Sequence, residues 1–263
     1  MGIFDGILLC SDWDGTLSYQ NKVSTPDIEA LNYFMKEGGM FTISSGRFLP
    51  YLAKFFDIIK PNTYVITLNG AIIISPDGKE VIHKGFLKES AIELCDAVIQ
   101  NNELIERITV YLKKNESSIN FDAKDYCLYR EKIINEEIYK ILLINNDPKK
   151  ILEAQSIIQS YNDKNHVAVR SWENGLEILS KDNTKGIAVK KLAKKLNSKL
   201  LVCAGDFEND IDMLIAADIS YATESSPENV KKFAKRITAD PMNSGIAKII
   251  HELEHDILPH FKS

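Results

Sequence analysis

Two aspartates near the start of the chain, Asp12 and Asp14, have the spacing of a catalytic carboxylate pair. They follow the apolar run 7–10, which predicts a buried strand, and Gly15 predicts the turn that ends it. Residues two apart in a strand point to the same side, so both carboxylates would share one small volume. They would repel each other there unless a cation lies between them or one carries a proton. The alternative is a structural Asp/Gly turn, because this short sequence is common in turns.

Further polar side chains follow other apolar runs, at the points where strands would stop. They are Ser45, Gly46 and Arg47, then Asn69 and Gly70, and finally Asp206, Asn209 and Asp210, with Lys185 just before a helix. Each could be a simple turn, a helix cap or a solvated lysine. A parallel sheet, however, brings the carboxyl ends of its strands to one edge, where open α/β sheets bind ligands. Their joint occurrence with the aspartate pair therefore favours a catalytic site.

The elements that must position these groups alternate between strand and helix. Apolar runs at 7–10, 40–44 and 64–68 predict strands, and the stretches 25–37 and 48–58 between them predict helices. The same alternation returns near the C-terminus, with predicted helices at 185–196, 210–217 and 244–257, a further helix that starts at 226, and predicted strands at 200–204, 219–222 and 236–238. This pattern is typical of an α/β fold with a doubly wound parallel sheet.

Between these two stretches the pattern changes. A hairpin at 71–84 is followed by predicted helices at 88–101 and 148–161 and by predicted strands at 107–113, 118–122, 139–145 and 166–171. We therefore predict a discontinuous α/β core, 1–79 and 181–263, and an inserted α+β domain, 80–180. The connections near 79–86 and 179–184 would have no strong secondary structure and would act as hinges.

Composition points to an ordinary globular protein. The 263 residues are 44% hydrophobic and 26% charged, and the formal net charge of −5 does not suit a nucleic-acid-binding surface. We expect no membrane-spanning segment and no secretory signal, and no protein partner is evident. The four cysteines are scattered, at Cys10, Cys95, Cys127 and Cys203. This favours free thiols in a reducing cytoplasmic location over disulfides or a zinc site.

Taken together, the motifs resemble those of the haloacid dehalogenase-like (HAD) phosphatases, and most closely the Cof-type branch with a large inserted cap. The four family motifs occur in order, as Asp12-Trp13-Asp14-Gly15-Thr16, Ser45, Lys185 and Gly205-Asp206-Phe207-Glu208-Asn209-Asp210. Segments 69–71 and 176–178 match those that flank the cap of that branch. The resemblance implies a Rossmann-like HAD core with the insert as its cap domain.

The resemblance also implies roles, which agree with the needs of phosphoryl transfer: an in-line nucleophile and positive charge on the phosphoryl oxygens. Asp12 would attack phosphorus and form an aspartyl-phosphate, while Asp14 would act as general acid and then as base. Mg²⁺ would be bound by Asp12, by the backbone carbonyl of Asp14 and by Asp206. Lys185 would supply a fixed positive charge against the phosphate and Asp12.

Other residues would bind phosphate or support the site. Phosphate oxygens would accept hydrogen bonds from Ser45, Asn209 and the backbone N–H groups of Trp13 and Gly46. The Trp13 side chain would point away from the site, because strand alternation directs it to the opposite face. Asp210 would either orient the phosphate, a metal-bound water or Lys185, or contact the metal directly.

Four residues are candidate substrate contacts: Arg47 and Asn69 in the core, and Trp172 and Glu173 in the insert. The last two belong to the segment 170–174, whose aromatic and hydrogen-bonding side chains would suit a polyol, although a polar turn with a packed tryptophan is the simpler alternative. Because the core motifs would bind only the phosphoryl group and metal, discrimination between esters should come from the insert.

The leading hypothesis is a Mg²⁺-dependent phosphatase that acts on small phosphorylated metabolites, in particular sugar phosphates. A phosphomutase or phosphotransferase would share these motifs but pass the phosphoryl group to a sugar instead of water. A binding module that kept only the fold would be expected to lose a nucleophile or metal ligand. Asp12, Asp14, Lys185 and Asp206 are all present, which argues for an enzyme.

Overall fold

The computed structural model describes residues 2–100, 103–114 and 117–258. The chain divides into two compact units, Met1–His83 with Lys185–Ser263, and Lys84–Thr184. We call the first the core and the second the insert, and describe each by itself. Each junction lies four residues after the boundary expected from the sequence. Residue 101, at the end of an expected helix, lies outside the described residues.

The core is built on a five-stranded parallel sheet with the strand order β13-β12-β11-β1-β2. Its strands are β1 (Ile7–Ser11), β2 (Met40–Ile43), β11 (Leu200–Gly205), β12 (Ile219–Thr223) and β13 (Arg236–Thr238). After β1 the chain adds β2 on one side, and later returns to add β11 on the other. Order therefore reverses beside β1, which is where ligand crevices form in such sheets.

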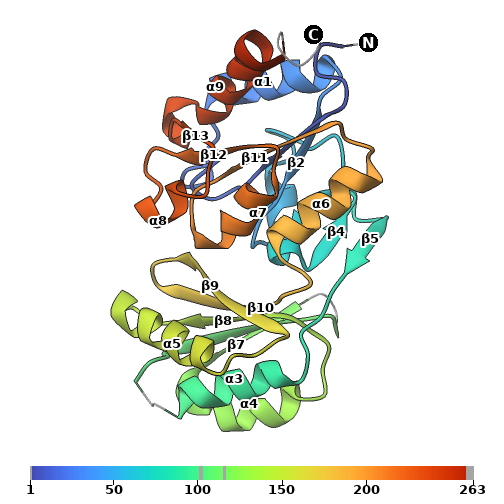
Figure 1. Cartoon of the computed structure of the whole chain (residues 1–263). Coiled ribbons are helices and arrows are strands. Elements are labelled where there is room, and N and C mark those ends of the chain that lie inside the picture. Colours follow the sequence, from blue (N-terminus) through green and yellow to red (C-terminus); the bar gives the residue numbers. More distant parts are fainter. Residues whose placement is uncertain (1, 101–102, 115–116, 259–263) are drawn as a thin grey trace. The chain divides into compact units, whose positions relative to one another are not determined.

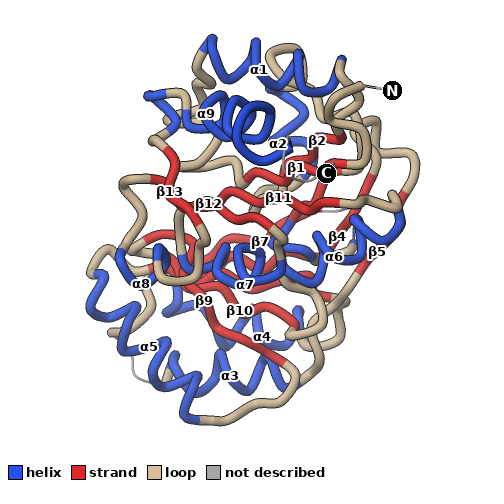
Figure 2. Tube along the Cα trace, turned by 45° about the horizontal axis from the view of Figure 1, so that its top comes forward, coloured by secondary structure: helices blue, strands red, loops and turns tan. Residues whose placement is uncertain are grey.

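Helices cover both faces of this sheet (Figures 1 and 2). They are α1 (Thr25–Lys36), α2 (Leu49–Leu52), α6 (Lys185–Lys195), α7 (Ile211–Ala216), α8 (Glu228–Lys231) and α9 (Gly245–Glu252), the last continued by a π-helical turn, Leu253–Ile257. Alternation in β1 serves both layers. Ile7 and Leu9 pack with α1 and α9, whereas Leu8 and Cys10 pack with α6 and α7. This doubly wound architecture confirms the predicted fold class.

The third predicted core strand departs from the expected parallel pairing. β3 (Val65–Thr67) pairs antiparallel with β4 (Ile72–Ile74), and these two strands form a separate small sheet with β5 (Val81–Lys84). Among the described residues, the strand pairing between β3 and the end of β2 is an isolated parallel bridge between Ser44 and Ile66. The chain reverses at Leu68 and Asn69, which both adopt positive φ angles (50° and 55°). A left-handed pair of residues turns the chain back on itself, so β4 pairs with β3 directly.

The helix expected at 48–58 is also shorter. Only Leu49–Leu52 is α-helical, and Ala53–Phe55 continues it as a 3₁₀ turn. Other 3₁₀ turns are Leu68–Gly70, Ala123–Asp125, Glu208–Asp210 and Pro241–Asn243. Aromatic residues lose side-chain freedom in a helix, and 3₁₀ geometry commonly tightens helix ends. The aromatic-rich sequence after Leu52 is consistent with this early end.

The insert has one antiparallel sheet with the strand order β7-β6-β8-β10-β9. Its strands are β6 (Arg107–Leu112), β7 (Ser117–Asp122), β8 (Ile138–Ile144), β9 (His166–Trp172) and β10 (Gly175–Ser180); its helices are α3 (Ser90–Ile99), α4 (Tyr126–Ile133) and α5 (Pro148–Ser160). All three helices share one hydrophobic core with a single face of this sheet. The insert is therefore a two-layer α+β unit.

Two features of the insert were missed in the sequence. The helix α4 was not predicted because it is short and has little apolar periodicity. The strand β10 was not predicted because its segment 176–178 was matched only to a family motif. The expectation of no strong secondary structure was wrong for 81–84, which form β5 as the predicted hairpin requires, and for 179–180, where β10 ends; it holds for 181–184. Backbone pairing with neighbouring strands explains both, because β10 lies between β8 and β9 and β5 lies beside β4.

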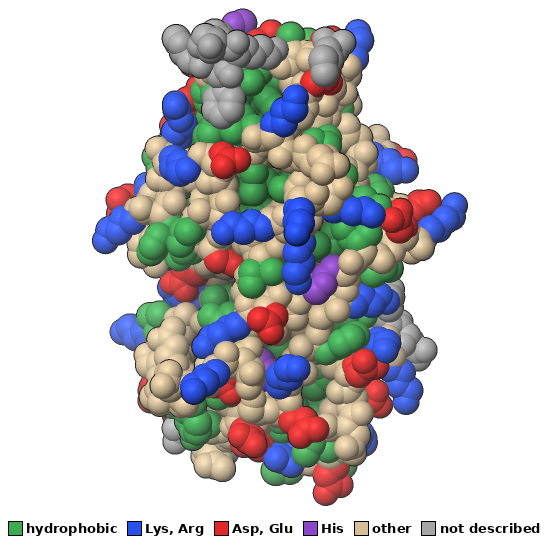
Figure 3. Space-filling view, turned by 45° about the vertical axis from the view of Figure 1, so that its right-hand side comes forward, with side chains coloured by type: hydrophobic (Ala, Val, Ile, Leu, Met, Phe, Trp, Pro, Cys, Tyr) green, Lys and Arg blue, Asp and Glu red, His purple; other side chains and the backbone are tan. Residues whose placement is uncertain are grey.

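The surface carries charges of both signs. On the face shown in Figure 3, lysine and arginine side chains are interspersed with aspartate and glutamate in both units, without a broad field of one sign among the described residues. No helix within the described ranges is long and apolar enough to cross a membrane.

Candidate active site

Asp12 and Asp206 lie side by side because the strands that carry them are neighbours. Asp12 directly follows β1 and Asp206 directly follows β11, and the two strands pair in parallel up to Ser11 and Ala204. The backbone N–H of Asp12 continues this pairing, donating to the Ala204 carbonyl at 2.9 Å. The carboxyl ends of the neighbouring strands β1 and β11 therefore bring together two carboxylates that are far apart in the sequence.

Lys185, the first residue of α6, is fully buried between two of the carboxylates. Its Nζ donates to Asp12 Oδ1 at 2.5 Å and to Asp210 Oδ1 at 2.6 Å. The side chain is 0% exposed, so a solvated lysine at a helix end is ruled out. Among the described residues, Asp12 Oδ2 accepts no hydrogen bond, so this oxygen faces the site without a protein donor.

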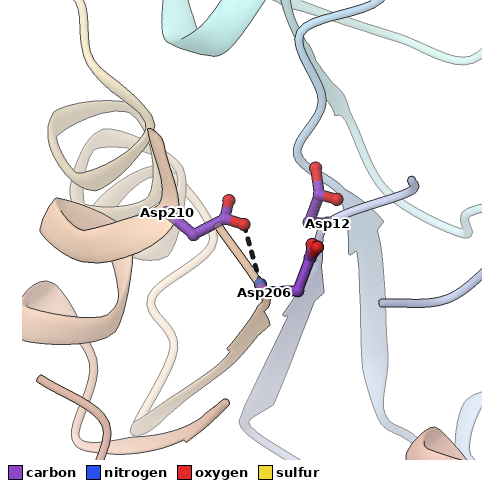
Figure 4. A group of neighbouring side chains, drawn as sticks. All are labelled: Asp12, Asp206 and Asp210. Atoms are coloured by element: carbon purple, nitrogen blue, oxygen red, sulfur yellow. Dashed lines mark hydrogen bonds between the residues drawn. The ribbon is translucent and has the colours of Figure 1, made fainter. Parts of the chain in front are cut away.

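Asp210 holds the loop after β11 in place. Its Oδ2 accepts hydrogen bonds from the backbone N–H groups of Asp206 (3.0 Å, dashed in Figure 4) and Phe207 (3.3 Å), while its Oδ1 accepts from Lys185. Both oxygens are thus engaged by the protein. This supports the first of the two roles considered for Asp210, in which it orients Lys185 and the Asp206 loop.

Loss of hydration controls the ionisation of this cluster. Burial raises the pKa of Asp12 well above its ordinary value; Lys185 lowers it, and the neighbouring carboxylates raise it again. Burial and the charge of Asp210 raise the pKa of Asp206 to about 7. Burial alone would lower the pKa of Lys185. The charges of Asp12 and Asp210 raise that pKa by more than burial lowers it, so the lysine stays protonated. The carboxylates of this cluster carry more negative charge than Lys185 can neutralise, as expected of a site that binds a cation.

The donor set fits a hard divalent cation. Asp12, Asp206 and Asp210 each offer a carboxylate oxygen, and these three atoms lie within 4.8 Å of one another (Figure 4). Carboxylate oxygens at this spacing suit Mg²⁺. Because Asp210 is held by three hydrogen bonds, Asp12 and Asp206 are the side chains best able to bind the ion.

Gly15 and Thr16 shape the space around Asp206. Gly15 has a φ of +88°, and a Cβ added there would lie 2.3 Å from Asp206 Oδ2, so both its backbone conformation and the close approach require glycine. The hydroxyl of Thr16 donates to Asp206 Oδ1 at 2.9 Å. The sequence marks Thr16 only as part of a motif; a hydroxyl four residues after Asp12 was the available signal.

A second group of predicted residues meets where β2 and β3 end. The backbone N–H of Asn69 donates to the Ser45 carbonyl at 2.9 Å, and Asn209 Nδ2 donates to Asn69 Oδ1 at 3.1 Å. A Cβ on Gly46 would lie 3.3 Å from the Asn69 side chain. Asn69 therefore links the Ser45 loop to the Asp206 loop. This gives it a structural part beside the substrate contact that was predicted.

Asp14 and Trp13 point in different directions, as predicted. Trp13 is 0% exposed and its ring lies 5.0 Å from that of Phe55 in the core. The Asp14 side chain is 46% exposed and forms an ion pair with Arg47 at 2.9 Å. Arg47, predicted as a substrate contact, thus touches the proposed acid–base residue.

The remaining candidates belong to the insert. Trp172 ends β9, is 39% exposed, and lies over Gly175, where a Cβ would come within 2.5 Å of its ring. Glu173 follows in the turn before β10. Their part in substrate binding stays a prediction, whereas the core residues are joined by the contacts described above.

Asp212, which the sequence did not single out, anchors the start of α6. Asp212 Oδ2 accepts from the backbone N–H of Gly186 at 2.9 Å, and a Cβ on Gly186 would lie 2.4 Å from the Asp212 carbonyl oxygen. This contact fixes the start of α6 against α7 and so places Lys185. No local sequence signal distinguishes Asp212 from an ordinary first-turn acid in a helix.

Comparison with known proteins decides the family. Residues 9–250 match the family model described as haloacid dehalogenase-like hydrolase. The chain belongs to this family. Phosphatase YwpJ of Bacillus subtilis (strain 168) is 26% identical over 286 residues, covering 94% of this chain and 99% of the relative.

Solved HAD structures share the fold. The HAD subclass IIB sugar phosphatase BT4131 aligns with a TM-score of 0.77 at 21% identity, covering 94% of this chain and 98% of that one. A haloacid dehalogenase-like hydrolase from B. subtilis aligns with a TM-score of 0.76 at 23% identity, with coverage of 94% and 99%. The family resemblance drawn from the motifs is confirmed.

Proposed function

We propose that this HAD hydrolase is a Mg²⁺-dependent phosphatase that hydrolyses phosphate monoesters of small metabolites, sugar phosphates among them, through an aspartyl-phosphate. The observation that carries the proposal is the buried contact of Lys185 with Asp12 beside Asp206. A carboxylate held by a fixed positive charge next to a cation-binding cluster suits attack on an anionic phosphoryl group. The relatives named as phosphatases support the same reaction class.

In the first step, Asp12 Oδ2 attacks phosphorus while Lys185 holds Oδ1. The bond between phosphorus and the ester oxygen breaks, and Asp14 gives its proton to that oxygen. In the second step, a water oxygen attacks the phosphorus of the aspartyl-phosphate, Asp14 takes the water proton, and the bond to Asp12 breaks. Phosphate leaves and both aspartates return to their starting states.

The surrounding groups neutralise charge. When bound by Asp12, Asp206 and the Asp14 carbonyl, Mg²⁺ supplies positive charge that offsets repulsion between carboxylate and phosphate. Ser45, Asn209 and the backbone N–H groups of Trp13 and Gly46 bind the phosphoryl oxygens in this proposal. The ligand is a small phosphorylated metabolite, and a cytoplasmic location agrees with four free cysteines, three of them buried.

A phosphate-release panel over many phosphorylated metabolites, with and without Mg²⁺, tests the proposal. We expect release with several sugar phosphates and its loss after chelation; no release from any ester would reject the phosphatase function. The alternative is a phosphomutase or phosphotransferase with the same intermediate. ³¹P NMR separates the two, because transfer to a sugar gives a new phosphate ester whereas hydrolysis gives inorganic phosphate.

A further inference from the structure

Arg47 makes a two-point contact with the acid–base residue. Its Nε donates to Asp14 Oδ2 at 2.9 Å and its Nη2 donates to Asp14 Oδ1 at 3.3 Å, so each carboxylate oxygen accepts one hydrogen bond. The two side chains are 48% and 46% exposed. An ion pair this exposed adds little to folding stability. Its main physical effect is therefore on the direction in which the carboxylate points.

Arg47 is itself restrained by Tyr51. The guanidinium carbon lies 4.6 Å from the centre of the Tyr51 ring, a stacking distance that restricts the arginine. The Tyr51 hydroxyl donates to Asn21 Oδ1 at 2.6 Å, and Asn21 lies in the loop that follows Asp14. Two contacts, Arg47 to Asp14 and Tyr51 to Asn21, thus join the loop after β1 to the segment that starts α2.

We propose that Arg47 is a positioning residue for general acid catalysis: stacked on Tyr51, it sets the direction in which Asp14 delivers its proton to the leaving oxygen. The inference rests on the proposed function. Each carboxylate oxygen has two lone pairs and Arg47 uses one on each, so Asp14 keeps a site for the proton. The proton passes from Asp14 to the ester oxygen as the phosphorus–oxygen bond breaks. Arg47 stays charged throughout and exchanges no proton.

The leaving group provides the test. Protonation by a general acid matters most when the departing oxygen is strongly basic and least when it is a weak base. Para-substituted phenyl phosphates vary this basicity while leaving the reacting end and ring size nearly constant. For the full-length protein with Mg²⁺, kcat/KM is measured along this series, from 4-methoxyphenyl to 4-nitrophenyl phosphate. Misplacing a reacting group can cost about 10²-fold in rate.

For Arg47→Ala we expect kcat/KM to fall at least about tenfold with the 4-methoxyphenyl ester and less than about twofold with the 4-nitrophenyl ester. The plot against leaving-group pKa should therefore become steeper. Arg47→Lys should recover part of the loss, since one ammonium replaces one arm of a two-point contact. Tyr51→Leu, which removes the stacking surface, should steepen the plot to an intermediate degree.

Lys54 supplies the matched control. Its Nζ lies 5.7 Å from the centre of the same Tyr51 ring, so Lys54→Ala removes a cation from that ring and should leave the wild-type slope unchanged. An equal loss for every ester in Arg47→Ala, or no loss, would overturn the inference, and so would a Lys54→Ala slope as steep as that of Arg47→Ala. Absence of turnover by the wild type with these esters and with every ester of the metabolite panel would instead reject the proposed function, and the inference with it.

Discussion

Replacing Lys185 by methionine should remove the fixed positive charge of the site while keeping a side chain of similar length. Lys185 is fully buried and contacts Asp12 at 2.5 Å and Asp210 at 2.6 Å, so no solvent can take the place of its ammonium group. Loss of a preorganised charge aimed at a transferring group costs on the order of 3 kcal/mol in the transition state. That corresponds to roughly a 100-fold fall in kcat.

The ionisation of Asp12 adds to this loss. Burial raises the pKa of Asp12 and Lys185 is the group that lowers it, so the substitution should raise that pKa further. More of the nucleophile is then protonated, and the deficit in kcat should grow as the pH falls. Removing one partner of a buried ion pair also lowers the free energy of unfolding by about 3–5 kcal/mol. The loss is smaller where Asp12 takes up a proton, because the buried carboxylate is then no longer charged.

The assay is phosphate release from 4-nitrophenyl phosphate at saturating Mg²⁺ over a range of pH, with urea unfolding of the same samples. Lys190→Met is the matched control, because Lys190 lies on the same helix with an exposed side chain and should behave as wild type. A fall in kcat of less than about threefold for Lys185→Met, which is about 0.7 kcal/mol, would contradict the role given to Lys185.

Three further outcomes are expected. Without metal, the melting temperature should rise as the pH is lowered from about 8 to about 6, because the folded protein takes up a proton at Asp206, whose pKa of about 7 exceeds its unfolded value. Asp206→Asn should lose most of that rise, and an unchanged rise would argue against this assignment. Gly15→Ala should increase the Mg²⁺ concentration needed for half-maximal activity, since its Cβ would meet Asp206 Oδ2 at 2.3 Å; a titration with the wild-type midpoint would refute that reasoning. Alanine at Trp172 and Glu173 should change the ranking of kcat/KM among sugar phosphates, whereas a uniform change would place this segment outside the specificity surface.

The meeting of Asp12 and Asp206 could be predicted from the sequence because local rules bring the two residues to one place. An apolar run followed by Asp12 and Asp14 predicts a strand end, and a parallel sheet places Asp206 at the same edge. Lys185 was different: its position before a helix also fits a solvated lysine, and only the family resemblance gave it a role. Its complete burial is set by the packing of α6 against the sheet, which no local pattern specifies.

Long-range contacts and reversals of direction could not be predicted in this way. The ion pair between Asp14 and Arg47 joins two loops 33 residues apart, and its geometry depends on the course of both loops. The short apolar run 64–68 predicts a strand but does not say whether its partner runs parallel or antiparallel. Positive φ angles at Leu68 and Asn69 decided that question, and leucine gives no signal for such a conformation.

The most direct test of the central claim, that Asp12 is the nucleophile of a phosphatase, is phosphate release by Asp12→Asn beside the wild type. Asparagine keeps the shape of the side chain but cannot form the aspartyl-phosphate. We expect release below about one thousandth of the wild-type rate, with a cooperative thermal transition retained. Turnover within about tenfold of the wild type would contradict it, since the chemistry would then proceed without the carboxylate on which every other role in this site depends.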